Sequence, residues 1–307
     1  MKLANGQQPW QKERMICGRN RLKKLQSSRQ NDYLCIKIRN MTITDWIHHR
    51  DMTGRPCFSF AEVREAFPMS SDKTIANSLS RLVSRKVLAL PAKGFYCVIP
   101  SQYALHGVLP PSYYVNQLMI YCEKPYYVGL LSAAVFWGAS HQRPQQFSIM
   151  TVPPKFQRSK NRNNMLLWFY RQSIPEKFLL EKNTETSSVK YSNAELTALD
   201  LVQFEQHIGG LSRAATVLSE LLENTDFNGA SNELFSYTTL HTIQRLGYIV
   251  DIILEDEVQA DIIYREMTNY RNKIQYCYLS NSHKQNKDTV DKRWRVYVNV
   301  EIEPDDI

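Results

Sequence analysis

The pattern of apolar and polar positions divides the chain of 307 residues into three parts. Residues 1–40 show no helical or strand period before a short apolar run at 33–38, which predicts a disordered arm. From Met41, short stretches with apolar residues at helical spacing alternate with turn residues. Beyond residue 112, longer helical patterns mix with β-branched and aromatic runs. The pattern predicts an α+β protein with folded domains at 41–100 and 113–307, joined by a Pro-bearing linker at 101–112.

Three short helices are expected in the first domain. Ile43, Trp46 and Ile47 form one apolar face, and a second helix at 60–67 ends before Pro68. The third, at 70–85, begins with serine as a side-chain cap and Asp72 in the first turn, where the helix dipole favours an anion. Its apolar stripe consists of Ile75, Leu79, Leu82 and Val83. The opposite face is polar and basic, so one face packs and the other is available for recognition.

A β-hairpin is expected directly after the third helix. Two short apolar runs, at 87–90 and 95–99, flank the turn at 91–94. Three helices followed by a hairpin predict a winged helix-turn-helix, whose third helix enters the major groove while the hairpin approaches flanking phosphates. The expected DNA-binding residues are Lys73, Thr74, Asn77, Ser78, Arg81, Arg85 and Lys93. The alternative is a protein-docking winged helix on which Arg81 and Arg85 form an ordinary solvated face.

The second domain is expected to be larger and mixed in structure. Apolar runs at 147–152, 165–170 and 178–180 predict strands, and an alternating run at 294–302 predicts a last strand. A helix at 194–204 follows a capping box at 192–195 and ends before Gly209 and Gly210. Further helices are predicted at 213–222, 234–246 and 258–267. A small-residue run at 129–139 is typical of a tightly packed helix.

The formal net charge of +8 suggests a nucleic-acid partner until it is divided along the chain. Residues 1–40 hold ten Lys or Arg and two acids, residues 41–100 hold eight and five, and residues 101–307 hold twenty and twenty-three. The basic character therefore belongs to the front of the chain. The arm at 1–40 is either a DNA-clamping tail or a non-native leader before a true start at Met41. We favour the leader, because no later element needs the arm for packing.

Several classes of protein are excluded by composition. No apolar run approaches the roughly 20 residues that span a bilayer, and the first residues lack the apolar centre of a secretory signal. Six cysteines lie far apart without a Cys-x-x-Cys pair, which predicts neither a zinc site nor a disulfide framework. A reducing cytoplasm fits best, and no cofactor is expected.

One stretch, at 128–147, resembles the edge of an active site because Ser132, Ser140, His141 and Arg143 follow small apolar residues. A triad needs a nucleophile within reach of the histidine and an acid that orients its ring. No Gly-x-Ser-x-Gly elbow holds either serine, and no acid partner can be nominated. We therefore expect no catalytic residue here, and a histidine at a helix–strand corner more often bonds backbone groups.

Candidate metal and phosphate sites are equally weak. Glu185 and Asp200 are a conceivable metal-binding carboxylate pair, but a polar loop and a helix explain them without metal. The run at 255–257 is contiguous and lacks the alternate spacing of a hard-cation loop, which favours a solvated helix start. No Gly-x-x-x-x-Gly-Lys loop occurs. The sequence predicts neither a metal site nor an enzyme.

Five sequence blocks together resemble the AbiEi family of bacterial antitoxins. They are VGLLSAAVFWGASHQRPQ at 128–145, ELTALDLV at 195–202, GGLSRAATVL at 209–218, RLGY at 245–248 and WRVYVN at 294–299. With KGFY at 93–96 in the expected wing, the similarity covers residues 41–307. The resemblance implies an abortive-infection toxin–antitoxin system. In it, the winged helix represses its own operon through operator DNA, and the second domain counters a nucleotidyltransferase-like toxin.

The resemblance changes the interpretation of the 128–145 block from a catalytic centre to framework or functional surface. His141, Gln142, Arg143 and Arg213 are the exposed polar residues expected to contact the toxin or its substrate. Two alternatives stay open: a stand-alone regulator whose second domain senses a ligand, and a nuclease that depends on Glu185 or Asp200. An adjacent toxin gene would distinguish the antitoxin from the regulator.

Overall fold

The structure is a computed structural model that describes residues 41–105, 107–139, 144–156, 165–283 and 289–304. The chain divides into two compact units, residues 1–107 and 108–307, which we call unit 1 and unit 2. Each is described by itself. No helix within the described ranges is long and apolar enough to cross a membrane.

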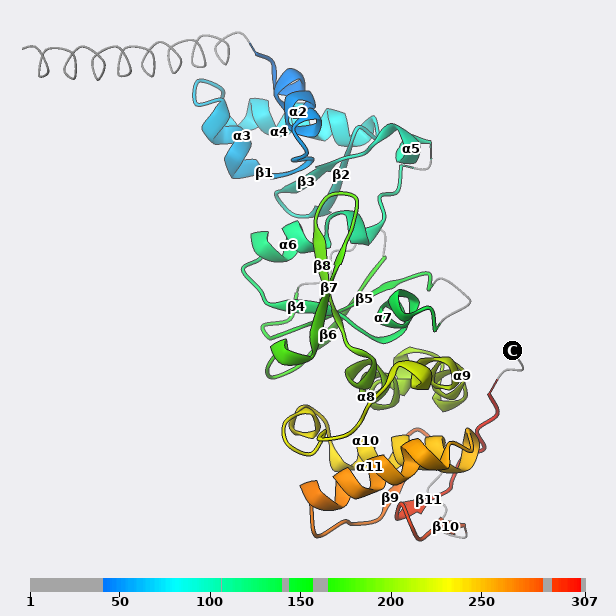
Figure 1. The fold of residues 1–307 in the computed structure, drawn as a ribbon. Helices are drawn as coiled ribbons and strands as arrows, with labels where there is room; N and C mark the ends of the chain where they lie inside the picture. The colour runs from blue at the N-terminus through cyan, green and yellow to red at the C-terminus, as the bar shows by residue number, and fades with distance from the viewer. Residues whose placement is uncertain (1–40, 106, 140–143, 157–164, 284–288, 305–307) are drawn as a thin grey trace, which may run out of the picture. The chain divides into compact units, whose positions relative to one another are not determined.

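The described part of unit 1, residues 41–105, contains four helices, the last of them short, and a three-stranded antiparallel sheet (Figure 1). In chain order the elements are α2 (Ile43–Met52), β1 (Cys57–Ser59), α3 (Phe60–Ala66), α4 (Asp72–Ser84), β2 (Leu88–Ala92) and β3 (Phe95–Val98), followed by the short helix α5 (Ser101–Ala104). The strand order β1-β3-β2 places the hairpin partner β3 in the centre of the sheet. This is the element order of a winged helix-turn-helix, with α4 as third helix and β2–β3 as wing.

Side-chain caps explain where the helices of unit 1 begin. Thr42 and Asp45 form a capping box on α2, and Ser59 and Glu62 form one on α3. Ser71 caps α4 by accepting the Thr74 backbone N–H at 3.2 Å. All three helices pack on one core, which consists of Ile47, Phe58, Val63, Ile75, Leu79, Leu88 and Val98.

The first half of unit 2 is built on a mixed five-stranded sheet of order β6-β5-β4-β8-β7. Its elements are η1 (Pro111–Tyr113), α6 (Val115–Tyr121), β4 (Tyr126–Val128), α7 (Leu130–Trp137), β5 (Phe147–Thr151), β6 (Leu166–Tyr170), η2 (Glu176–Phe178), β7 (Leu179–Asn183) and β8 (Ser188–Ser192). β4 is antiparallel to β5 and parallel to β8, while β5 and β6 are parallel. The central strand β4 leads directly into α7.

The second half of unit 2 is mainly helical and ends in a small sheet. Its elements are α8 (Ala194–Gln203), η3 (Glu205–His207), α9 (Leu211–Leu221), η4 (Leu222–Asn224), η5 (Leu234–Tyr237), α10 (Leu240–Tyr248), the π-helix η6 (Ile249–Ile253), α11 (Glu257–Tyr270), β9 (Cys277–Tyr278), β10 (Val290–Asp291) and β11 (Val296–Tyr297). Helices α8 to α11 lie between the five-stranded sheet and the small sheet of order β10-β11-β9 (Figure 1). One apolar cluster joins these helices to both sheets.

The α+β class is confirmed, and most predicted elements are found within a few residues of their expected bounds. Three local predictions are wrong. The run at 294–302 forms only the two-residue strand β11, because the turn before it holds Trp294 in the core. The helix at 234–246 is split into η5 and α10, with Thr239 capping the second. The cap of α8 is Asn193 and not Ser192, and the Glu195 carboxylate accepts the Asp226 backbone N–H instead.

The segment expected as a linker, 101–112, carries α5 and most of η1. The expected end of α8 at Gly209 and Gly210 is also displaced, because η3 intervenes before them. Both glycines have positive φ, and they lead into α9. Glycines with positive φ were expected at the end of α8, and they lie instead at the start of α9.

Candidate functional site

The polar face of α4 is exposed as the amphipathic pattern predicts. Seven residues are candidates for DNA binding, and all but Ser78, which is half-buried, are exposed: Lys73, Thr74, Asn77, Arg81, Arg85 and the wing residue Lys93. Without Lys93, the six candidates between 73 and 85 fall within an arc of about 140° at 3.6 residues per turn. Ile75 and Leu79 point away from this arc into the core, with no exposed surface. The structure therefore brings the helix residues together on one accessible face.

Two of these candidates also have local structural roles. The Thr74 hydroxyl lies 2.9 Å from the Ser71 hydroxyl, and the Ser78 hydroxyl donates to the Thr74 carbonyl at 3.0 Å. Both contacts are within the helix and leave the neighbouring Asn77 and Arg81 side chains on the exposed face. Thr74 and Ser78 are thus positioned by the helix itself, whereas Asn77 and Arg81 are the better candidates for base contacts.

The tip of the wing is anchored to unit 1 by the backbone. The two-residue turn between β2 and β3 is Lys93–Gly94, and Gly94 has a φ of +77°, a conformation that glycine adopts without strain. Its carbonyl accepts the Phe60 backbone N–H at 2.7 Å, at the first residue of α3. The exposed Lys93 therefore projects from a fixed turn.

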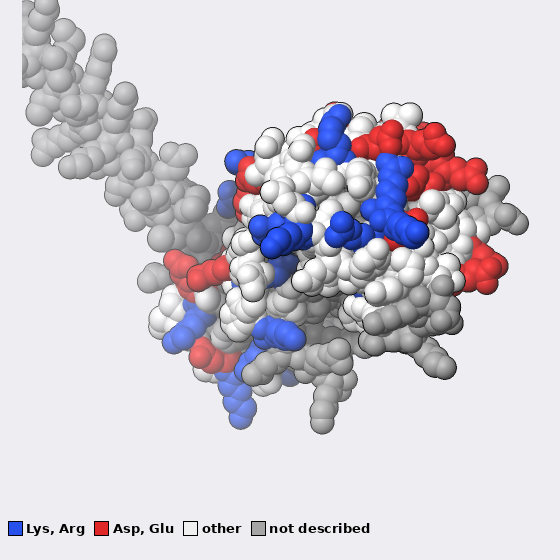
Figure 2. Space-filling model, turned by 90° about the horizontal axis from the view of Figure 1, so that it is seen from below, with Lys and Arg blue, Asp and Glu red and all other residues white. Residues whose placement is uncertain are grey.

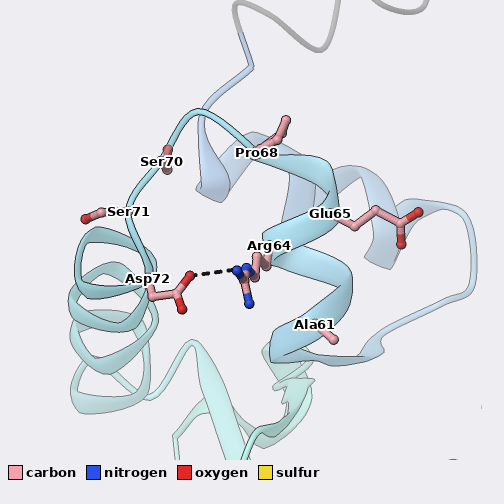
Figure 3. A pocket seen from close by; sticks show the side chains of 7 residues that line it. All are labelled: Ala61, Arg64, Glu65, Pro68, Ser70, Ser71 and Asp72. Atoms are coloured by element: carbon pink, nitrogen blue, oxygen red, sulfur yellow. Dashed lines mark ion pairs between the residues drawn. The ribbon is translucent and has the colours of Figure 1, made fainter.

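A pocket of about 450 Å³ lies where α3 meets the start of α4 (Figure 3). It is lined by Ala61, Arg64, Glu65, Pro68, Ser70, Ser71 and Asp72. Arg64 and Asp72 form an ion pair across it at 3.4 Å, and Glu65 contributes a second negative charge. An anion would meet two carboxylates beside one guanidinium here, so the charges of this pocket do not favour phosphate.

The centre of unit 2 holds a buried charged network. Asp200 on α8 is fully buried, and its carboxylate accepts from the Arg171 guanidinium and from the Tyr127 hydroxyl, the latter at 2.8 Å. Arg171 is 8% exposed and also donates to the Tyr237 carbonyl. Burial raises the pKa of Tyr127 to about 12, against an opposing effect of Arg171. The phenol therefore stays a neutral donor at physiological pH.

This network involves one member of the carboxylate pair Glu185 and Asp200. Both Asp200 oxygens are occupied by protein donors, while Glu185 lies exposed in the turn between β7 and β8. Within the described ranges, no group of three or more His, Cys, Asp or Glu side chains is arranged to hold a metal ion. In the 255–257 run, Asp256 caps α11 by accepting the Gln259 N–H at 3.0 Å, as expected for a helix start.

The 128–145 block begins at a strained turn between β4 and α7. Leu130 has a φ of +55° and is fully buried, and Ser132 accepts the Ser148 backbone N–H at 2.9 Å. A Cβ on Gly129 would lie 2.8 Å from the Met150 side chain, so only glycine fits against β5. The described part of the block is therefore packed framework. Ser140 and the three candidates His141, Gln142 and Arg143 lie outside the described residues.

The RLGY and WRVYVN blocks pack directly against each other. A Cβ on Gly247 would lie 1.9 Å from the Trp294 ring, so the absence of a side chain there makes room for the indole. The Trp294 Nε1–H donates to Asp251 in the π-helix η6 at 2.8 Å. Arg245 donates to the Tyr278 carbonyl at 2.9 Å and to the Asn281 side chain at 2.7 Å. These blocks connect α10 to the small sheet.

A cluster of titratable groups lies beside α10 and was not predicted from the sequence. Burial raises the pKa of Glu205, an effect that the nearby Arg245, His283 and His207 partly oppose. Burial and Arg245 lower the pKa of His241. The sequence analysis also missed Arg171. Two signals could have found its pair with Asp200: Arg171 is a charged residue directly after the apolar strand run at 165–170, and Asp200 lies inside a buried helix pattern.

Comparison with known protein families matches the part of the chain that contains most of these blocks. Residues 127–252 match the family described as the AbiEi antitoxin C-terminal domain. Residues 127–252 therefore correspond to this antitoxin domain. Four of the five blocks that resemble the family lie wholly or mostly within the matched residues, and the buried Tyr127–Asp200–Arg171 network is inside it. No curated protein matches the chain.

A solved structure shares the fold of this chain over most of its length. The crystal structure of the Rv2827c protein from Mycobacterium tuberculosis superposes with a TM-score of 0.58 at 11% sequence identity, covering 78% of this chain and 85% of that one. At this identity the likeness concerns the fold alone. It agrees with the mixed α+β architecture described above.

Proposed function

We propose that this AbiEi chain is the antitoxin of a bacterial abortive-infection system and acts in the cytoplasm without enzymatic activity. Unit 1 binds operator DNA and represses the antitoxin's own operon, and unit 2 counters a nucleotidyltransferase-like toxin. The observation that carries the proposal is the match of residues 127–252 to the AbiEi antitoxin C-terminal domain. The exposed face of α4 supports the DNA-binding part.

The case for DNA rests on the chemistry of that face. Asn77 and Arg81 offer the amide and guanidinium groups that read adenine and guanine edges in a major groove. Lys73 and Arg85 form no ion pair with any described residue and supply positive charge for phosphates. Lys93 at the anchored wing tip supplies a further cation.

The test of the DNA-binding part is a titration of the full chain with the DNA upstream of its own gene. Asn77→Ala and Arg81→Ala should each weaken binding by about 1–3 kcal/mol and relax specificity. Lys93→Ala should weaken all sequences alike and reduce the salt slope by about 1. Arg55→Ala, an exposed arginine outside α4 and the wing, is the charge-matched control. Unchanged affinity in all three variants would exclude this face as the reader.

The proposed antitoxin surface is His141, Gln142, Arg143 and Arg213. Arg213 is half-buried in the first turn of α9, and its stem packs near Gly209, where a Cβ would lie 3.2 Å from Arg213 Cδ. Its guanidinium therefore extends from a fixed base. The proposal assigns these four side chains to contact with the toxin or with the toxin's substrate.

Co-expression with the adjacent toxin tests the antitoxin part. Fragment 101–307, once its thermal melt shows that it is folded, should relieve growth arrest without unit 1. Alanine variants at His141, Gln142, Arg143 and Arg213 should restore arrest while keeping the thermal midpoint of the wild type. Arrest with the folded fragment but not with the full chain would show that antitoxicity needs unit 1. Arrest with both would favour a stand-alone regulator.

A further inference from the structure

Three tyrosines form a ring stack on the small sheet at the end of unit 2. The ring centroids of Tyr276 and Tyr297 are 5.3 Å apart with an interplanar angle of 30°, and those of Tyr278 and Tyr297 are 5.2 Å apart at 39°. Tyr297 therefore lies between the other two. Tyr276 ends the stack and is 45% exposed, which is unusual for so large an aromatic side chain with two neighbours.

The strand register explains why the three rings share one face. β9 and β11 are parallel, with Cys277 opposite Val296 and Tyr278 opposite Tyr297. Cys277 and Val296 are buried in the core of unit 2. Since successive side chains alternate between the two faces of a strand, the tyrosines point to the outer face. Strand pairing fixes Tyr278 and Tyr297, while Tyr276 directly precedes β9 and is held by its ring contact with Tyr297.

Cations are frequent in the chain segments that carry these tyrosines. Segments 271–283 and 289–298 hold five Lys or Arg, which are Arg271, Lys273, Lys292, Arg293 and Arg295, and a single acid, Asp291. Arg293 is neutralised by Asp251 and Asp261. Lys273 and Lys292 are exposed and form no ion pair with any described residue. Arg295 donates to the Ile274 carbonyl, which brings its guanidinium to the segment that leads into Tyr276.

The local charge differs from the charge of the unit as a whole. Residues 101–307 have twenty Lys or Arg and twenty-three acids, yet the segments 271–283 and 289–298, which carry the tyrosines, have five Lys or Arg and one acid. Seen from the end at which β9, β10 and β11 lie, several Lys and Arg side chains are spread over uncharged surface, while Asp and Glu gather toward its margins (Figure 2). A binding surface is defined by its local field, so the net acidity does not exclude a polyanion here.

We propose that this face, the outer surface of β9 and β11 with Tyr276 at its exposed end, binds single-stranded RNA. A nucleobase stacks on the exposed aromatic ring at the end of the stack, and the flanking cations contact the phosphates of the RNA backbone. Duplex DNA fits less well, because its bases are already stacked and shielded. Among nucleic acids, RNA presents unpaired loops and ends, and proteins read these by stacking on aromatic side chains. The proposal is independent of the operator-binding function of unit 1.

The experiment measures binding of the full chain to a labelled, unstructured RNA of about 12 nucleotides, a length within the site sizes of single-strand binders. An excess of unlabelled duplex DNA occupies unit 1. Tyr276→Ala should weaken binding at least about fivefold, and Tyr276→Phe should retain it, because stacking needs the ring and not the hydroxyl. Tyr121→Ala, which removes a tyrosine of similar exposure from α6, is the matched control and should bind as the wild type does.

A second readout locates the RNA on the chain. RNA that carries 4-thiouridine should form photo-crosslinks to peptides from 271–283 and 289–298, and Tyr276→Ala should reduce them. The double variant Lys273→Gln, Lys292→Gln should lower the salt slope by about 0.7 per charge removed. Crosslinks confined to other segments, together with unchanged affinity of Tyr276→Ala, would overturn the proposal. Equal affinity for single-stranded DNA of the same sequence, or tighter binding of duplex RNA, would overturn the assignment to single-stranded RNA.

Discussion

The α4 face of unit 1 and the family-matching blocks of unit 2 differ in burial: the first is exposed to solvent and the second are packed in the core. On α4 the residues of interest, such as Asn77 and Arg81, are exposed and have few contacts within the protein. In unit 2 the residues that carry the family resemblance are buried against other parts of the unit: Asp200 bonds Tyr127 and Arg171, and Gly247 packs on Trp294. A shared sequence block therefore marks a packed framework in unit 2. A functional surface has to be sought among the exposed residues that this framework positions.

The largest expected effect comes from removing one partner of the buried network. Asp200→Ala leaves the Arg171 guanidinium buried without its carboxylate, which should lower the free energy of unfolding by about 3–5 kcal/mol. Urea denaturation followed by tryptophan fluorescence measures it. Asp261→Ala breaks an ion pair with Arg293. The Asp261 side chain is 74% exposed, so the variant should lower the free energy of unfolding by about 1 kcal/mol or less. Similar losses in both variants would contradict the contrast between buried and exposed pairs.

The next effect concerns the close contact between α10 and the Trp294 ring. Gly247→Ala places a methyl group into the indole, and overpacking of this kind costs about 1–3 kcal/mol or more. Trp294→Leu removes the ring, so the double variant should lose at least about 1 kcal/mol less than the sum of the single losses. Gly138→Ala, where φ is +79° and no atom lies within 4 Å, measures backbone strain without a clash, whereas Gly247 lies in α10 without a positive φ and its variant tests the clash. Additive losses would show that Gly247 acts through the backbone and not through Trp294.

The sequence predicted helices α2, α3 and α4 of unit 1 well, because each of them has a side-chain cap and an apolar stripe. The α4 face followed from the stripe of Ile75 and Leu79 alone. Strand β1 was missed, because three residues between two helices give no periodic signal. In unit 2 the long helices α8, α9 and α11 were predicted for the same reason as α4.

The functional features of unit 2 could not be derived locally, because they depend on pairing between distant segments. Arg171 and Asp200 meet only when the strand end of β6 lies on α8. The tyrosine stack needs the parallel register of β9 and β11, which places Tyr276 and Tyr297 together from 21 positions apart. The alternating run at 294–302 indicated β11, but the two residues of β9 give no alternation, so neither the register nor the shared face was visible in the sequence.

A smaller effect separates binding from stability on α4. Arg81→Ala should weaken operator binding by about 1–3 kcal/mol while changing the free energy of unfolding by no more than about 0.5 kcal/mol, because the side chain is exposed. Leu79→Ala, two positions away and fully buried, should lower the free energy of unfolding by about 2–5 kcal/mol. Parallel titrations and urea denaturation check both. A stability loss in Arg81→Ala as large as in Leu79→Ala would remove the distinction between the two faces.

The smallest effect is a pH dependence at the Glu205 cluster, where a buried charge costs stability. Burial raises the folded-state pKa of Glu205 above its usual value of 4.5, so the folded protein holds this proton more tightly than the unfolded chain. At low pH both states are protonated and the carboxyl has no net effect. As pH rises through 4.5 to the raised pKa, the wild type loses stability, and above it the loss stays constant.

Glu205→Gln cannot ionise, so its stability relative to the wild type should increase over that pH interval and then level off. Thermal or urea unfolding at a series of pH values measures the difference. Glu223→Gln, an exposed glutamate in η4, removes the same charge without the burial and should leave the shape of the curve unchanged. A difference that shrinks with rising pH would mean that Arg245, His283 and His207 stabilise the carboxylate more than burial penalises it. Unit 2 would then contain a stabilising ion cluster beside α10.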